Sequence, residues 1–192
     1  MTVVILAGGQ SRRMGQDKMC LPVSGETMLL RLYRRYGAVF PRVRVSVADE
    51  SRYPELGDAR IFDRYPGLGP LAGLHAALAE TGDDIFLTAG DMPYSDPEKA
   101  AALATLCMDF EACVLLDGEG RREPLFGFYR ASLAERAEQR LKEGRRGMVD
   151  FLRSLRVREV TLAELGEGAD SPLLRNVNEP GDYKKLRLEL GE

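Results

Sequence analysis

Four short apolar runs recur along the first half of this chain, each followed within a few residues by a glycine or an aspartate. They are residues 3–6, 43–47, 59–62 and 85–88. Short runs rich in β-branched residues are typical of strands buried on both faces. Apolar residues at helical spacing fill two of the intervals, over residues 26–40 and after Pro70. The alternation predicts an α/β fold with a mostly parallel, Rossmann-like, doubly wound sheet, helices on both faces, and ligands outside the carboxyl ends of the strands.

The pattern changes in the second half. Asp117-Gly-Glu-Gly120 reads as a hairpin turn between strands at 112–116 and 124–129, which predicts a small antiparallel excursion. Asp96 and Pro97 are suited to begin a helix. Capping-box spacing places further helix starts near Ser132 and Thr161, and a last helix is expected from about Pro180.

Composition narrows the possible functions. A chain of 192 residues without a long linker or repeat suits one domain, residues 1–192. Its longest uncharged apolar run is far shorter than the roughly 20 residues that span a bilayer, so we expect a cytoplasmic protein. The net charge of −3 suggests neither a nucleic-acid partner nor a membrane surface. The three cysteines lack C-x-x-C spacing, so we expect free thiols without a disulfide or zinc-binding role. The single histidine, His75, has no partner at metal-ligand spacing and is expected to be an ordinary helix residue.

The glycine-rich segment Leu6-Ala-Gly-Gly-Gln-Ser-Arg-Arg-Met-Gly-Gln-Asp-Lys18 carries the strongest chemical signal. Its glycines let backbone N–H groups approach phosphate oxygens, and Arg13 and Lys18 supply positive charge. It is neither a Walker loop nor the G-x-G-x-x-G of a dinucleotide fold. On spacing alone, a phosphate cradle and a solvated basic turn both remain open.

Other polar residues also follow predicted strands. Asp91 comes just after residues 85–88, where a carboxylate can hold Mg²⁺, although an Asp-x-Pro alone is more often a turn. Asp63 alone reads as a loop-capping carboxylate. Asn176 and Asn178 could offer amide donors and carbonyl acceptors to a ligand, or could simply form the turn before the last helix. Arg145 and Arg146 could grip a phosphate or form an exposed charge run.

The pattern Leu-Ala-Gly-Gly-x-Ser-x-Arg-Met-Gly-x-Asp-Lys resembles the signature of the MobA-like nucleotidyltransferases, and specifically of the molybdenum cofactor guanylyltransferases. Further similarities follow in order: Gly69-Pro-Leu-Ala-Gly73, Gly90-Asp-Met-Pro93 and Asn176-Val-Asn178. Glu123-Pro-Leu125 is similar to the family segment that closes over the acceptor. The resemblance runs from residue 3 to about residue 183 and implies a nucleotidyltransferase fold of GT-A-like type.

The resemblance also implies an activity, which is Mg²⁺-dependent transfer of GMP from GTP to the molybdopterin cofactor with release of pyrophosphate. GTP and molybdopterin cofactor would be its substrates, and molybdoenzymes or other proteins of cofactor biosynthesis its partners. The implied catalytic residues are Lys18, Arg13 and Asp91, with Asp91 as the metal ligand. The implied GTP-binding residues are Leu6, Ala7, Gly8, Gly9, Arg13, Lys18, Asp63 and Asp91. The implied acceptor-binding residues are Gly69, Pro70, Gly73, Arg146, Asn176 and Asn178.

One departure and three alternatives accompany this interpretation. An Asn that contacts the nucleotide in some family members falls on Ala48 or Asp49 here. A molybdopterin cytidylyltransferase would share the mechanism, although Gly8-Gly9 favours guanine. Sugar-nucleotide or isoprenoid cytidylyltransferases would share the fold and the first loop but not Asn176-Val-Asn178. A carrier that binds nucleotide or cofactor without catalysis would not need both Lys18 and Asp91.

Overall fold

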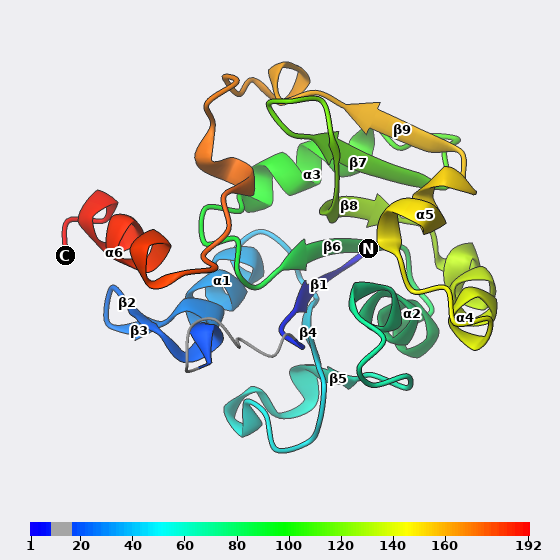
Figure 1. Cartoon of the computed structure of the whole chain (residues 1–192), viewed down its shortest axis with the longest axis horizontal. Coiled ribbons are helices and arrows are strands. Elements are labelled where there is room, and N and C mark those ends of the chain that lie inside the picture. Colours follow the sequence, from blue (N-terminus) through cyan, green and yellow to red (C-terminus); the bar gives the residue numbers. More distant parts are fainter. Residues whose placement is uncertain (9–16) are drawn as a thin grey trace.

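The computed structural model describes residues 1–8 and 17–192 and is built around a seven-stranded sheet (Figure 1). Across the sheet the strands are β5 (Arg60–Phe62), β4 (Val43–Val47), β1 (Thr2–Leu6), β6 (Ile85–Ala89), β8 (Arg122–Tyr129), β7 (Ala112–Leu116) and β9 (Val157–Val160). β1 pairs in parallel with β4 and with β6, and β4 with β5. β8 runs antiparallel between β6 and β7, while β9 is parallel to β7. The predicted mostly parallel sheet with an antiparallel excursion is confirmed.

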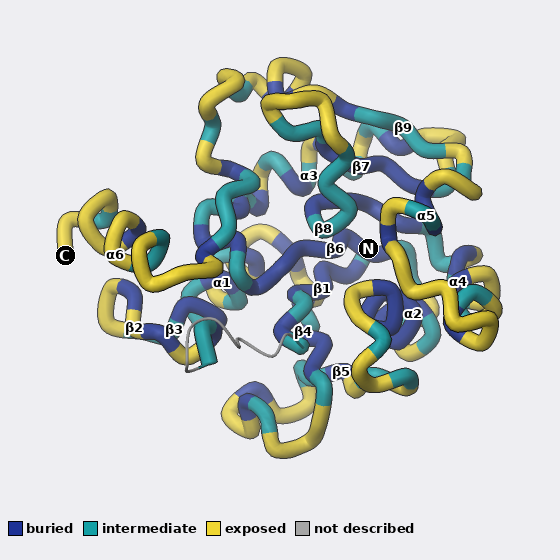
Figure 2. Tube along the Cα trace, in the orientation of Figure 1, coloured by how far each residue is buried: buried dark blue, intermediate teal, exposed yellow. Residues whose placement is uncertain are grey.

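Helices cover both faces of the sheet, as the sequence predicts. α1 (Met28–Gly37) and α3 (Pro97–Thr105) pack into one apolar core, which also takes in Leu186 of α6 (Pro180–Glu189). α2 (Pro70–Thr81), α4 (Ala134–Lys142) and α5 (Met148–Arg153) pack into a second core. Figure 2 shows the strands buried between these layers and the connecting loops exposed.

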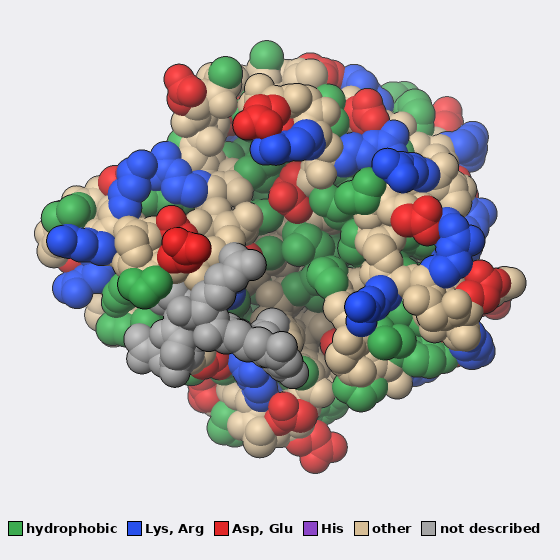
Figure 3. All heavy atoms as spheres, viewed as in Figure 1, with side chains coloured by type: hydrophobic (Ala, Val, Ile, Leu, Met, Phe, Trp, Pro, Cys, Tyr) green, Lys and Arg blue, Asp and Glu red, His purple; other side chains and the backbone are tan. Residues whose placement is uncertain are grey.

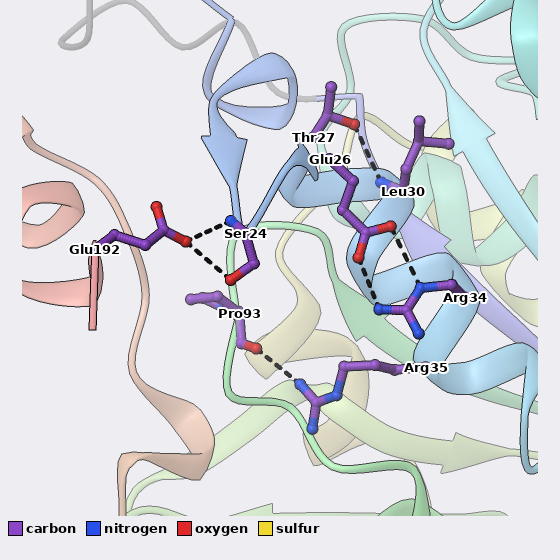
Figure 4. A network of polar contacts seen from close by, with 8 residues as sticks. All are labelled: Ser24, Glu26, Thr27, Leu30, Arg34, Arg35, Pro93 and Glu192. Carbon is purple, nitrogen blue, oxygen red and sulfur yellow. Dashed lines mark hydrogen bonds and ion pairs between the residues drawn. The ribbon is translucent and has the colours of Figure 1, made fainter. Parts of the chain in front are cut away.

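The predicted first helix begins later than residue 26. Glu26–Thr27 forms strand β3, which pairs with β2 (Pro22–Val23) in a small hairpin. The turn between them places Ser24 and Gly25 at φ 50° and 83°, a conformation that ends one strand and returns the chain as another. Thr27 then caps α1, because its hydroxyl accepts a hydrogen bond from the Leu30 amide (3.3 Å; Figure 4).

The second half differs from the sequence predictions in three places. A helix does start near Ser132, as predicted, because α4 begins at Ala134. Ser132 does not cap it, since this residue lies inside the 3-10 turn Ala131–Leu133 and α4 has no side-chain cap. The chain turns earlier because Asp84 accepts a hydrogen bond from the Ala131 amide (2.8 Å). Thr161 does form reciprocal hydrogen bonds with Glu164, but they enclose a 3-10 turn and no α-helix. Helix α5 and strand β9 were not predicted.

Several smaller expectations can be compared with the structure. The Asp117–Gly120 turn is closed by a hydrogen bond from the Gly120 amide to the Asp117 carbonyl (3.0 Å). The cysteines are free thiols, with Cys20 exposed and the other two buried. His75 lies buried in α2, edge-on to the Tyr65 ring. Among residues 1–8 and 17–192, no helix combines the length and apolarity needed to cross a membrane.

Candidate functional site

The order of the strands identifies one place for a ligand. From β1 the chain adds β4 and β5 on one side and then returns to add β6 on the other. A doubly wound sheet binds its ligands at such a reversal, outside the carboxyl ends of the two strands on either side of it. Figure 3 shows a hollow on this face of the molecule, over the carboxyl ends of β1 and β6. The residues that follow these strands are Ala7 and Gly8 after β1, and Gly90 and Asp91 after β6.

One group of side chains gathers beyond β1 and β4. Asp63 accepts a hydrogen bond from the Ser46 hydroxyl (2.9 Å). A Cβ on Gly8 would stand 3.7 Å from the Asp63 carboxylate. A Cβ on Gly73 would stand only 2.6 Å from Leu6 Cδ2 and 2.9 Å from Ser46 Oγ, so the start of α2 presses directly on the strand ends. The structure therefore brings together Leu6, Gly8, Asp63 and Gly73.

The carboxyl group of Asp63 has a raised pKa. Burial raises its pKa, and the hydrogen bond from Ser46 only partly opposes that effect. Within residues 1–8 and 17–192, no arginine or lysine contributes to this shift. A half-buried carboxylate is well suited to accept hydrogen bonds from N–H groups of a ligand.

The second group lies beyond β6 and joins three distant parts of the chain. Lys18 Nζ stands 2.5 Å from Asp91 Oδ2 and 2.9 Å from Asn178 Oδ1. Lys18 and Asp91 are both largely covered, with side chains 12% and 20% exposed. One ammonium group is therefore held between a carboxylate and an amide oxygen at the carboxyl edge of the sheet. Such preorganised charge is what stabilises developing charge in a transition state.

Backbone hydrogen bonds fix the turn that carries Asp91. The Gly90 amide donates to the Leu6 carbonyl (2.9 Å), and the Val177 amide donates to the Asp91 carbonyl (2.8 Å). A Cβ on Gly90 would meet Met19 Sδ at 2.7 Å, so only glycine fits there without displacement. Arg35 of α1 donates to the Pro93 carbonyl (2.9 Å; Figure 4). The turn is thereby attached to β1, to α1 and to the segment before α6.

Glu123, at the start of β8, adds a further carboxyl group near Asp91. Its side chain accepts a hydrogen bond from the Leu125 amide (2.9 Å). Burial raises its pKa, and the negative charges of Asp91 and Asp117 raise it further. β8 runs antiparallel to β6 with Phe126 opposite Thr88, so the segment Glu123-Pro-Leu125 lies at the carboxyl edge of β6, the edge that Asp91 follows.

The remaining predicted site residues are placed as follows. Gly69 and Pro70 form the exposed start of α2, with Gly69 at φ 79°. Asn176 is half-buried in the segment that docks on Asp91. Arg146 is exposed between α4 and α5, and within the described part of the chain no hydrogen bond joins it to the other predicted site residues. Gly9 and Arg13 lie outside the described residues.

Sequence reasoning missed two side chains that hold the site in place. Ser46 orients Asp63, and the signal available was a hydroxyl residue one position before the end of the strand Val43–Val47. Asp182 accepts hydrogen bonds from the amides of Asn178 and Glu179 (2.9 Å each), and these bonds lower its pKa. It completes a capping box with Glu179 at the start of α6. The N-terminal turn of α6 thereby positions Asn178.

The oxygen atoms around Lys18 are also suited to a hard cation. Asp91 Oδ2 and Asn178 Oδ1 converge on one positively charged group. Among residues 1–8 and 17–192, no three His, Cys, Asp or Glu side chains form a metal-binding cluster. Mg²⁺ commonly takes one or two carboxylates and completes its shell with substrate phosphates and water. The donor set therefore fits a divalent cation that brings part of its own coordination shell.

Comparison with known proteins agrees with this geometry. Residues 3–160 match the model of the MobA-like NTP transferase domain. A protein of Carboxydothermus hydrogenoformans named "Probable molybdenum cofactor guanylyltransferase" is 35% identical over 188 residues, covering 97% of this chain and 94% of that protein. A Mycobacterium tuberculosis protein of the same name is 38% identical, with 91% and 87% covered. The crystal structure of molybdopterin-guanine dinucleotide biosynthesis protein A from Archaeoglobus fulgidus superimposes with a TM-score of 0.87 at 26% identity, covering 100% and 99%. The chain belongs to the MobA-like NTP transferases.

Proposed function

We propose that this protein transfers GMP from GTP to the molybdopterin cofactor and releases pyrophosphate. The observation that carries the proposal is the Lys18 ammonium held between Asp91 and Asn178 at the carboxyl edge of the sheet. It lies in a chain similar over nearly its whole length to proteins named molybdenum cofactor guanylyltransferase. The cytoplasm remains the expected compartment, on the sequence argument alone.

The reaction asks the protein mainly to position groups and to offset charge. The terminal phosphate of the acceptor attacks the α-phosphorus of GTP, and the bond to the β-phosphate oxygen breaks as pyrophosphate leaves. No serine or cysteine nucleophile is needed, because the acceptor supplies its own. Lys18, with Arg13 from the glycine-rich loop, would offset negative charge on the phosphates, and backbone amides around Gly8 and Gly9 would hold the phosphates in line.

Asp91 is the residue that we expect to hold Mg²⁺, with Asn178 contributing an amide oxygen. When bound, Mg²⁺ supplies positive charge to the phosphate oxygens. The Lys18 ammonium, which pairs with the Asp91 carboxylate, would contribute positive charge beside the same phosphates.

The nucleotide and the acceptor would occupy opposite sides of this centre. Asp63, whose half-buried carboxyl lies beside Gly8 and Gly73, is placed to accept hydrogen bonds from the nucleoside. Asn176, Asn178 and the start of α2 at Gly69 and Pro70 are proposed for the acceptor side. Arg146 is proposed there as a phosphate contact from the loop before α5.

The decisive measurement is pyrophosphate release with molybdopterin cofactor and Mg²⁺, comparing GTP, CTP, ATP and UTP in parallel. We expect release with GTP alone. A preference for CTP would keep the mechanism and move the protein to the cytidylyltransferases. Nucleotide binding without release of pyrophosphate from any of the four would contradict catalysis and identify a carrier.

A further inference from the structure

The Asp17 carboxylate, next to Lys18 in the chain, is held by two side chains from the loop after β4. Asp17 Oδ2 accepts hydrogen bonds from Arg52 Nη2 (2.6 Å) and from the Tyr53 hydroxyl (2.8 Å). Its other oxygen, Oδ1, accepts from the Met19 amide (3.1 Å) and caps the 3-10 turn Lys18–Cys20. Both oxygens of this carboxylate therefore accept hydrogen bonds, and the bond from the Met19 amide holds the backbone on either side of Lys18.

Arg52 and Tyr53 contact each other as well as Asp17. Arg52 Nη2 also donates to the Tyr53 hydroxyl (2.7 Å), and its guanidinium lies over the Tyr53 ring at 5.1 Å. Burial raises the pKa of Tyr53, so the hydroxyl stays protonated and donates a hydrogen bond to the carboxylate. The Arg52 and Asp17 side chains are only 21% and 29% exposed, which protects the ion pair from solvent screening.

The backbone of this loop is held in a conformation that a tyrosine rarely adopts. Tyr53 has φ 50° and ψ 54°, in the left-handed region, and its side chain is 5% exposed. Left-handed backbone at a bulky residue costs energy and persists only where surrounding contacts fix it. The contacts that fix it here include the hydrogen bond to Asp17.

The negative charge of Asp17 matters because this residue is next to Lys18, which is proposed to bind phosphate. On the proposed function, Lys18 contacts the triphosphate, and Asp17 is its neighbour in the chain. An uncompensated carboxylate at Asp17 would repel the phosphates and would compete with them for Lys18. Arg52 compensates that charge through its 2.6 Å ion pair with Asp17.

We propose that Arg52 and Tyr53 are positioning residues for nucleotide binding: they neutralise and immobilise Asp17 so that Lys18 is presented to the triphosphate. This inference rests on the proposed function for the identity of the ligand. It assigns a role to the loop after β4, where this chain lacks the family Asn.

The test measures the KM and Kd for GTP in Arg52 and Asp17 variants. For Arg52→Gln we expect both to rise about tenfold with kcat changed less than about twofold, the scale of one unit charge about 10 Å from a phosphate. Adding Asp17→Asn should bring KM back to within about threefold of the unmodified protein, since the repelling charge is gone. Arg52→Lys should stay near the unmodified value, and added salt should shrink the Arg52→Gln defect.

Tyr53→Phe and Arg44→Gln complete the design. Tyr53→Phe keeps the buried ring and removes one hydrogen bond, so KM should rise by about two- to threefold. Arg44 forms a similar 2.6 Å ion pair with Glu80 and lies outside the site, so Arg44→Gln should leave KM unchanged. Thermal unfolding of each variant identifies any loss of folded protein.

Three outcomes would overturn the inference. They are an unchanged KM in Arg52→Gln, an equal defect with and without Asp17→Asn, and a defect indifferent to salt that follows thermal stability. GTP binding is measured separately from transfer with a fluorescent GTP analogue. If the unmodified protein binds GTP but transfers nothing, the proposed function fails while the Kd comparison still decides the role of Arg52. If it binds no GTP, both proposals fail.

Discussion

The Val177 amide donates a 2.8 Å hydrogen bond to the Asp91 carbonyl, joining the segment before α6 to the turn after β6. This bond puts Asn178 beside Lys18, whose ammonium then contacts both Asn178 and Asp91. The charged centre of the site therefore depends on three segments that meet only in the folded protein.

Replacing either member of the Lys18–Asp91 pair should reduce catalysis strongly. For Lys18→Ala and for Asp91→Ala we expect turnover to fall about 100-fold or more, the scale of losing one preorganised electrostatic contact. The fold should persist, because Lys18 lies in the 3-10 turn Lys18–Cys20, Asp91 lies in the turn after β6, and neither belongs to a core. Steady-state pyrophosphate release and circular dichroism measure the two effects.

A matched control is available on α3. Lys99 pairs with Glu167 at 2.9 Å, with side chains 26% and 25% exposed, and it does not belong to the site. Lys99→Ala should leave turnover unchanged. A loss smaller than about threefold in Lys18→Ala or Asp91→Ala would remove that residue from the mechanism.

Gly73→Ala should damage the junction between α2 and the strand ends. The added Cβ would meet Leu6 Cδ2 at 2.6 Å and Ser46 Oγ at 2.9 Å, so these atoms must shift. We expect the free energy of unfolding to fall by about 1–3 kcal/mol, as overpacking usually costs, and the KM for GTP to rise as Ser46 and Asp63 move. Urea unfolding gives the first quantity and initial rates the second.

Gly37→Ala is the corresponding control on α1. A Cβ there meets nothing within 4 Å, so the free energy of unfolding should stay the same or rise by up to about 1 kcal/mol. Equal stability losses at the two glycines would show that the contacts around Gly73 do not determine its effect.

Asp63 should make stability depend on pH in an identifiable way. Burial raises its pKa in the folded protein, so between the unfolded and folded pKa values the folded state binds more protons. The free energy of unfolding therefore falls as pH rises through that window. An asparagine at position 63 does not ionise and can still accept the hydrogen bond from Ser46. At pH values above the folded pKa of Asp63, the Asp63→Asn variant should therefore be more stable than the unmodified protein.

Below the pKa of an aspartate in the unfolded chain, near pH 4, Asp63 is protonated and is as uncharged as the asparagine of the variant. The difference in unfolding free energy between the unmodified protein and Asp63→Asn should therefore vanish there. Urea unfolding from pH 3 to pH 8 measures it. The same substitution should raise the KM for GTP by about tenfold, since a charged acceptor is lost. A stability difference that does not vary with pH would contradict this account of Asp63.

The residues that the sequence predicts well are those with a local cause. Val3 to Leu6 and the strand before Asp91 are apolar enough to need burial, and their positions follow from that alone. Asp96 caps α3 through the Glu98 amide (2.8 Å), as its type and place before Pro97 predict. Asp91 falls at the sheet edge for the same local reason.

The elements that were missed have weak local patterns and long-range causes. β9 has only two apolar residues, Val157 and Val160, and is fixed by parallel pairing with β7. α5 is six residues long, too short for a clear helical stripe. The meeting of Asp17 with Arg52 and Tyr53 leaves no trace in the sequence pattern, since it depends on how the loop after β4 folds back.

The pairing of Lys18 with Asn178 spans 160 positions, and it sets an order of events during synthesis. The last strand of the sheet, β9, ends at Val160, so every strand has been made before Asn178 is added. A chain released or cleaved between those two points would keep the seven strands of the main sheet and lack the Asn178 oxygen that contacts Lys18. The contact between Lys18 and Asn178 can therefore form only after the ribosome has added Asn178.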